Sequence, residues 1–109
     1  MTYKEVNTLI ASFGLPYAYY SFPEGTAQKT PFICYFYSTS DDLFADNTNY
    51  QDIRVLNIEL YTDEKDFSLE SSIESILKQN GITYYKEENM IETENMWQIA
   101  YETEVIING

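Results

Sequence analysis

Two stretches of alternating side chains constrain the fold of this chain more than any other feature of its sequence. In Gln51–Thr62, apolar residues at positions 56, 58 and 60 are separated by polar or aromatic residues. In Trp97–Ile107, one parity is uncharged throughout, whereas the other carries Glu102 and Glu104. Because successive side chains of a strand point to opposite faces, both stretches predict long strands with one buried face. The fold must therefore contain a sheet that buries one side against a covering layer.

Two other segments have the apolar spacing of amphipathic helices. The first, Tyr3–Phe13, follows Thr2, and Glu5 completes a capping-box pattern with that threonine. Gly14 is a natural residue to end this helix. The second helix is expected at Leu69–Gln79, where the apolar stripe is Leu69, Ile73, Ile76 and Leu77.

Two details of these elements follow from position alone. On the second helix, Glu70 and Glu74 are expected to face solvent, and Glu74 lies four residues before Lys78, a spacing that favours an ion pair. In the Gln51–Thr62 strand, the apolar residues at positions 53 and 55 have the opposite parity to those that follow. A bulge or a second packing surface near Arg54 would explain this switch.

Shorter segments complete the expected order. Further strands are predicted at Tyr17–Phe22, Phe32–Tyr37 and Ile82–Lys86, with loops at Pro23–Pro31 and Ser38–Asn49 and an acidic connection at Glu87–Asn95. The order is helix, three strands, helix, two strands, without regular alternation of strand and helix. We therefore expect one α+β domain spanning residues 1–109, with a single, largely antiparallel sheet and both helices packed on one face.

Charge and residue types limit the function. The chain has 18 acidic and 6 basic residues, a net charge of −12 and no histidine. This charge disfavours nucleic acid and anionic membranes as partners and suits a cationic partner. No apolar stretch approaches the ~18 residues of a membrane-spanning helix. The lone Cys34 lies in an apolar run and is expected to be a buried, unreactive thiol.

No pattern of catalytic or metal-binding residues is evident. Asp41, Asp42 and Asp46 have the composition of a calcium loop, but their spacing does not fit an EF-hand. A solvated acidic loop is the main interpretation, and a weak cation site is the alternative. No nucleophile pattern or phosphate-binding loop occurs. We expect no enzyme activity, no cofactor and no tightly bound metal.

The aromatic residues indicate an interaction role. The chain has 11 tyrosines, most of them in or beside expected strands. Strand propensity explains such a distribution, and so does a subunit interface, where tyrosine is enriched. Two helices cannot cover both faces of one sheet, so aromatic surface is left for a partner. The candidate interface residues are Leu43, Phe44, Tyr35, Tyr37, Asp41, Asp42 and Asp46.

Several segments together resemble small proteins of prophages and tailed phages. They are Pro31–Tyr37, the loop Asp41–Asn49 with its Phe-Ala-Asp-Asn core, the strand and turn Ile58–Asp66, and the closing pattern Tyr84–Lys86, Glu92–Met96 and Gln98–Val105. In this composition and order the chain is similar to the tail-terminator, or tail-completion (head–tail joining), family of siphophages.

The resemblance implies a structural virion protein without enzyme activity. Members of that family form a ring, commonly a hexamer, at the head-proximal end of the tail tube. The implied partners are other copies of the chain, the tail-tube protein and the head connector. The implied location is the host cytoplasm during assembly and then the virion tail. The alternative from composition is an acidic protein-binding module, regulatory or mimicking nucleic acid.

Overall fold

The computed structural model describes residues 1–23, 28–40, 43–45 and 48–107, and within 39–52 it describes the backbone alone. The elements along the chain are α1 (Tyr3–Ala11), β1 (Tyr17–Tyr19), β2 (Phe32–Ser40), β3 (Leu43–Ala45), β4 (Thr48–Thr62), α2 (Phe67–Gln79), β5 (Tyr84–Ile91) and β6 (Met96–Ile107). The order of strands across the sheet is β1-β2-β4-β6-β5, and β3 pairs with β4 outside this path.

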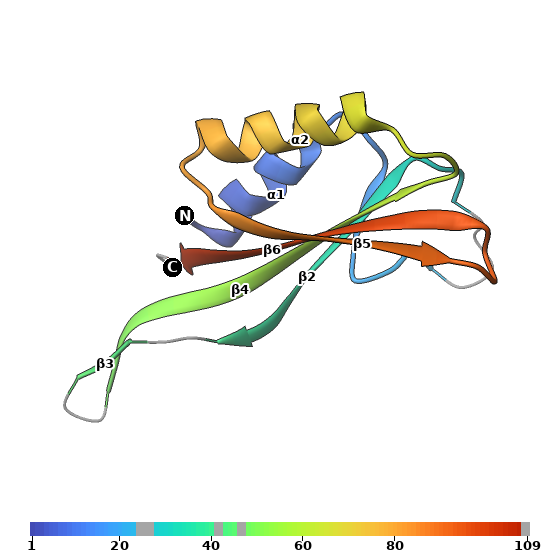
Figure 1. Ribbon diagram of the computed structural model, residues 1–109. Helices are drawn as coiled ribbons and strands as arrows, with labels where there is room; N and C mark the ends of the chain where they lie inside the picture. The colour runs from blue at the N-terminus through green and yellow to red at the C-terminus, as the bar shows by residue number, and fades with distance from the viewer. Residues whose placement is uncertain (24–27, 41–42, 46–47, 108–109) are drawn as a thin grey trace.

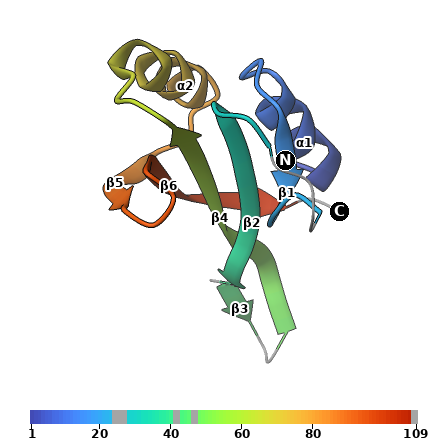
Figure 2. The same cartoon turned by 90° about the vertical axis from the view of Figure 1, so that its right-hand side faces the viewer.

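The sheet is largely antiparallel, as the sequence predicts. The pairs β2–β4, β4–β6 and β5–β6 are antiparallel, whereas the short edge strand β1 runs parallel to β2. Both helices lie on the same side of the sheet, and Figures 1 and 2 show the other side without a covering helix. The predicted α+β class and the placement of both helices on one face are confirmed.

The core lies between the helices and the covered face of the sheet. The apolar stripes predicted from spacing point into it: Val6, Leu9 and Ile10 of α1, and Ile73 and Leu77 of α2, are buried. They meet alternate residues of the central strands, namely Ile33, Tyr35, Leu56, Ile58, Leu60, Ile99, Tyr101 and Val105. The period-two pattern of the two long strands therefore marks the buried face correctly.

The ends of the helices follow local capping chemistry. The Thr2 hydroxyl accepts the Glu5 backbone N–H at 3.0 Å, and the Glu5 carboxylate accepts the Thr2 N–H at 2.9 Å, so the predicted capping box is present. This exchange lowers the pKa of Glu5. α1 ends at Ala11, two residues before the predicted end, because Ser12 acts as its C-cap and Gly14 follows at φ +78°.

The prediction of a loop at Ser38–Asn49 is wrong, because much of this segment is strand. β2 continues to Ser40, β4 begins at Thr48, and β3 pairs antiparallel with β4. These strands form a long hairpin that projects beyond the helices and the rest of the sheet (Figure 1). A register shift also occurs between Tyr37 and Ser40, opposite Arg54. The expected irregularity near Arg54 is therefore present, but it lies in β2, and β4 pairs with β6 without interruption.

Two strands differ in extent from the sequence prediction, and α2 begins at Phe67, two residues before its predicted start. β5 begins at Tyr84 and runs to Ile91, so most of the predicted acidic connection is strand and the turn to β6 spans residues 92–95. Asn95 takes φ +49° in this turn. The predicted strand Tyr17–Phe22 ends at Tyr19, because Tyr20 takes φ +68° and breaks the extended backbone.

Candidate interaction surfaces

The predicted interface residues Tyr35 and Tyr37 lie on the helix-facing side of β2. Tyr35 is 7% exposed, and its hydroxyl accepts a hydrogen bond from the Asn7 side chain at 2.9 Å. Tyr37 is half-buried beneath the Arg54 guanidinium, whose carbon lies 5.4 Å from the ring centroid. Burial raises the pKa of Tyr37 to about 12. Tyr35 is therefore mainly a core residue and Tyr37 lies at the margin of the core, and an interface role for either remains a prediction.

The other predicted interface residues lie in the projecting hairpin. Leu43 and Phe44 belong to β3, where their backbones are opposite Gln51 and Asn49 of β4. Asp41, Asp42 and Asp46 lie outside the described residues. The structure thus places the strand that carries the apolar pair on a projection from the domain, and the contacts of the five side chains remain a matter of prediction.

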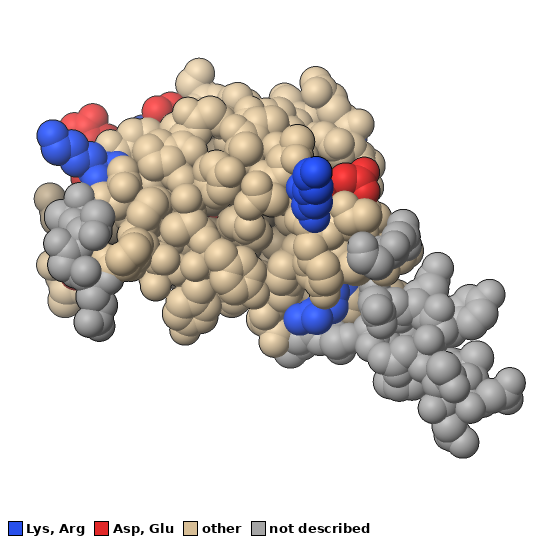
Figure 3. Space-filling view, turned by 180° about the vertical axis from the view of Figure 1, so that it is seen from behind, with Lys and Arg blue, Asp and Glu red and all other residues tan. Residues whose placement is uncertain are grey.

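Tyrosines gather on the side of the molecule formed by α1 and β1. Tyr19 contacts Tyr35 edge-on at 5.3 Å between ring centroids, and Tyr3 contacts Tyr37 edge-on at 5.2 Å. Tyr3 and Tyr19 remain 46% and 53% exposed. Figure 3, seen from behind, shows few charged side chains on this side of the molecule. A charge-poor aromatic surface is unusual for a chain of net charge −12 and suits a protein interface.

The uncovered face of the sheet is aromatic near β2. The rings of Phe32 and Tyr61 stack at 4.9 Å, Phe22 lies edge-on to Phe32 at 5.4 Å, and the 69% exposed Tyr20 contacts Phe36 at 5.6 Å. These residues come from β2, β4 and the segment after β1. The sequence predicted leftover aromatic surface, and this face carries it.

The same face is polar near β5 and β6. The Gln98 amide donates to Glu59 at 3.2 Å and to the Tyr61 hydroxyl at 2.9 Å, and it accepts from Asn89 at 3.3 Å. Burial raises the pKa of Tyr61 to about 12. A depression of about 260 Å³ lies here, and Glu87 and Glu102 line it together with these polar groups. The uncovered face is therefore divided into an aromatic half and a polar, acidic half.

A charged network lies between α2 and the strands β5 and β6, where the sequence predicted solvated glutamates. Glu70 is buried, with ion pairs to Lys65 at 2.5 Å and to Lys86 at 2.8 Å. Lys86 also pairs with Glu74 at 2.8 Å, and Lys65 with Glu88. The prediction that Glu70 and Glu74 face solvent is wrong, and Glu74 pairs with Lys86 in place of Lys78. The lysines that attract these carboxylates precede α2 or lie on β5, so helical spacing alone gave no sign of them.

The network shifts the acidities of its members. Burial opposes ionisation of Glu74, but hydrogen bonds from Lys86 and from the Tyr101 hydroxyl at 2.8 Å outweigh it and lower the pKa of Glu74. Burial also opposes the charge of Lys65 and Lys86, but their bonds to carboxylates raise the pKa of both lysines. Burial and the neighbouring Glu74 carboxylate raise the pKa of Tyr101. These shifts are those of a structural ion-pair cluster.

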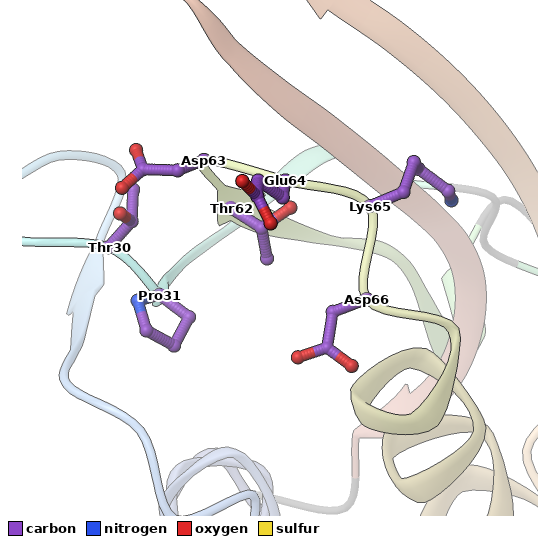
Figure 4. Close-up of a pocket in the computed structure, with 7 residues that line it drawn as sticks. All are labelled: Thr30, Pro31, Thr62, Asp63, Glu64, Lys65 and Asp66. Carbon is purple, nitrogen blue, oxygen red and sulfur yellow. The ribbon is translucent and has the colours of Figure 1, made fainter.

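A hollow of about 370 Å³ lies at the start of α2 (Figure 4). Thr62, the last residue of β4, is 5% exposed, and its hydroxyl has no hydrogen-bond partner among the described residues. Asp66 caps α2 by accepting the Leu69 N–H at 3.0 Å. Thr30, Pro31, Asp63, Glu64 and Lys65 complete the lining. In the sequence alone, residues 63–66 indicate only a polar turn before the second helix, and no pattern points to this hollow.

The described residues were compared with the requirements of a metal site and of a reactive thiol. Among the described residues, no group of three histidine, cysteine or acidic side chains is placed to hold a metal ion. Cys34 is 5% exposed, and burial, with a smaller effect of Glu59, raises the pKa of its thiol. A raised pKa keeps the thiol protonated and poorly nucleophilic. In the described part of the chain, no helix is both long enough and apolar enough to span a membrane.

Comparison with known proteins establishes a relationship of fold. No protein family matches the sequence, and no curated protein is significantly similar to it. Among solved structures, the chain is similar to one in the virion of a native gene transfer agent (GTA) particle. The match has a TM-score of 0.62 and covers 98% of this chain and 91% of the other, with 14% identity. The two chains share an α+β fold over nearly their whole lengths.

Proposed function

We propose that this chain is a structural virion protein of the tail-terminator type. In this proposal it forms a ring, six copies being the expected number, that ends the tail tube and joins it to the head connector. The observation that carries the proposal is the fold shared with a chain of a gene transfer agent virion, which extends over 98% of this chain. The tail-terminator role itself rests on the resemblance in sequence pattern.

The surfaces of the subunit support an assembly role. A ring subunit needs contacts to its neighbours and, on other sides, to the tube and the connector. The projecting β2–β3–β4 hairpin, the charge-poor α1–β1 side and the half-aromatic uncovered face are three separate surfaces of this kind (Figures 1 and 3). The acidic excess would give such a ring a negative wall that repels passing DNA.

The test is inactivation of the gene in the strain that produces the particles, followed by electron microscopy. A terminator limits tail growth, so we expect tubes of irregular length and heads without tails, with normal particles restored by the wild-type protein supplied from a plasmid. Immunogold labelling of wild-type particles should mark the junction of head and tail. Normal tails joined to heads in the inactivated strain would refute the proposed role.

The alternative, an acidic binding module, is favoured only by the net charge of −12. It predicts normal particles without the gene and no label on the virion. The same experiment therefore separates the two functions.

A further inference from the structure

The charge of this chain is distributed unevenly between the two sides of the sheet. Residues 1–40 contain two lysines and two glutamates, so residues 41–109 carry the whole net charge of −12. The elements within residues 1–40 are α1, β1 and β2, and the sheet order β1-β2-β4-β6-β5 places them on one side. Figure 2 shows α1 and β1 on that side and α2 and β5 on the other. The subunit therefore has a neutral side and an acidic side.

The neutral side presents a cluster of rings around the only arginine of the chain, and we call Tyr3, Tyr19, Tyr37 and Arg54 the tyrosine surface. The exposed rings of Tyr3 and Tyr19 contact the half-buried ring of Tyr37 at 5.2 and 6.1 Å between centroids. The Arg54 guanidinium lies over the same ring and donates to the Tyr3 hydroxyl at 3.3 Å. The Tyr19 hydroxyl accepts the Tyr37 backbone N–H at 3.3 Å. These contacts hold the exposed side chains in place before any partner binds.

The tyrosine surface has the residue types of a binding hot spot. Tyrosine and arginine are enriched among the residues that contribute most to binding, and side chains that are already held lose little conformational entropy on association. Lys4 follows Tyr3 on α1 and is exposed. In the described part of the chain, no carboxylate forms an ion pair with Lys4 or Arg54. Both cations are therefore suited to a partner that supplies carboxylates.

The other basic residues lie elsewhere. Lys65 and Lys86 are bound in the charged network. Lys29 is exposed beside Thr30, which lines the hollow at the start of α2, and Lys78 is exposed in the last turn of α2. Lys4 and Arg54 are thus the two cations that accompany the exposed tyrosines.

The acidic side carries exposed carboxylates beside a tyrosine, and we call Tyr85, Glu87 and Glu102 the acidic edge. Tyr85 of β5 is 81% exposed, and Glu102 of β6 lies opposite it in the ladder. Glu87 is two residues after Tyr85 and so points to the same face of the sheet. Both carboxylates are exposed, form no ion pair within the described residues and line the depression of about 260 Å³. Lys86 also lines this depression, but its ammonium group is bound in the charged network.

We propose that the tyrosine surface binds the acidic edge of a second copy of this chain. This inference rests on the proposed ring and specifies its subunit contact. Charge complementarity selects the arrangement, because two acidic edges repel one another, whereas the tyrosine surface brings Lys4 and Arg54 to the carboxylates of its neighbour. Contact between unlike sides is heterologous, which is the type of contact that closes a ring.

Photo-crosslinking in the strain that produces the particles tests this contact. The gene is replaced by a copy that carries Tyr19→p-benzoylphenylalanine, the particles are illuminated, and covalent dimers are isolated by mass and digested. Cross-links within one chain leave its mass unchanged, so the dimers report contacts between copies. The probe at position 19 should be joined to a peptide within residues 84–104, and a probe at Tyr85 to α1 or β1. A probe at Phe67, an exposed position on α2, is the control and should yield little dimer.

Charge reversal provides the second test, read by light scattering after size exclusion and by the amount of protein incorporated into particles. Lys4→Glu with Arg54→Glu should weaken association at least about ten-fold, as expected when one side of a close charge pair is lost. Glu87→Lys with Glu102→Lys should do the same, and a mixture of the two variants should associate again. Because Arg54 is half-buried, Lys4→Glu alone is the variant that keeps the fold, since an acidic residue is favourable in a first helical turn.

The controls match each variant in net charge. Lys29→Glu changes the net charge as Lys4→Glu does, away from the tyrosine surface. Glu92→Lys with Glu94→Lys, in the β5–β6 turn, changes it as the reversal of the acidic edge does. Both controls should associate at least as well as the parent protein. A general effect of net charge would act equally on variants and controls, so weaker association confined to the variants identifies the contact.

The outcomes distinguish this inference from the proposed function. Particles in which the probe at position 19 gives no dimer, or is joined to α1 or β1 of a second copy or to a different virion protein, overturn the contact and leave the virion role intact. Charge-reversed variants that associate and incorporate as the parent protein does also overturn it. A protein that is monomeric at every concentration and absent from particles overturns both proposals.

Discussion

Substitution of the buried Glu70 should be the most damaging single change of a charge in this domain. The carboxylate is 2% exposed and pairs with two lysines, at 2.5 and 2.8 Å. In Glu70→Gln the shape is kept, but the two lysines lose their shared counter-charge. Removing one member of a buried ion pair costs about 3–5 kcal/mol.

The estimate for Glu70→Gln lies near the lower end of that range. Lys65 keeps Glu88, and Lys86 keeps Glu74, so neither ammonium is left alone. Lys86 is also 34% exposed, and solvent screens part of its interaction. We expect a loss of about 2–4 kcal/mol, which for a domain near 100 residues lowers the melting temperature by roughly 10–20 °C.

Urea unfolding followed by circular dichroism measures this loss. Glu92→Gln in the β5–β6 turn is the matched control and should stay within about 0.5 kcal/mol of the parent, the usual range for surface substitutions. Lys65→Met combined with Glu70→Gln should cost less than the sum of the two single changes, since both remove the same pair. A Glu70→Gln protein as stable as the control would refute the view that the network holds α2 to β5.

Three further predictions follow from other residues. The pKa of Glu74 is lowered from its ordinary value of 4.5, so the stabilisation it gives is present above pH 4.5 and is lost as the pH falls further. Glu74→Gln should therefore flatten the acid limb of a plot of stability against pH, and an unchanged limb would contradict this. Cys34 should react with a thiol reagent at least ~10²-fold more slowly in native than in unfolded protein, because its thiol is buried with a raised pKa, and equal rates would show that it is accessible. Leu43→Ser with Phe44→Ser should leave the melting temperature within a few degrees and abolish assembly if the hairpin is an interface; a collapse of stability would place the pair in the core, and intact assembly would exclude the interface.

The elements that could be predicted from sequence are those that a residue's own chemistry determines. The stripe through Ile73 and Leu77 and the alternation at Leu56, Ile58 and Leu60 gave the covered face, because apolar burial needs no particular partner. The capping box at Thr2 could be predicted equally well, since its hydrogen bonds join residues within four positions of each other. These local signals were enough for the fold class and for the side of the sheet on which the helices lie.

The predictions of the hairpin segment and of the strand boundaries were wrong where local residue preferences disagree with the pairing of strands. Residues 38–49 are rich in serine, aspartate and asparagine, which favour turns, so a loop was expected. The backbone of Leu43–Ala45 nevertheless pairs with β4 as an extension of the sheet. The sequence prediction ends β5 too early, at Lys86, for a related reason. Glu87 and Glu88 have low strand propensity, but they lie opposite Ala100 and Ile99 in a regular antiparallel ladder.

Charged residues could not be placed from the sequence because their positions depend on partners elsewhere in the chain. Glu70 on an isolated helix would face water, and only Lys65 and Lys86, brought to it by the tertiary fold, make burial favourable. The hollow at the start of α2 could not be predicted for the same reason. Thr62 ends a strand and Thr30 belongs to a loop 32 residues earlier, so no spacing connects them. In a chain of net charge −12, each carboxylate that finds no lysine within the subunit adds to the repulsion between copies.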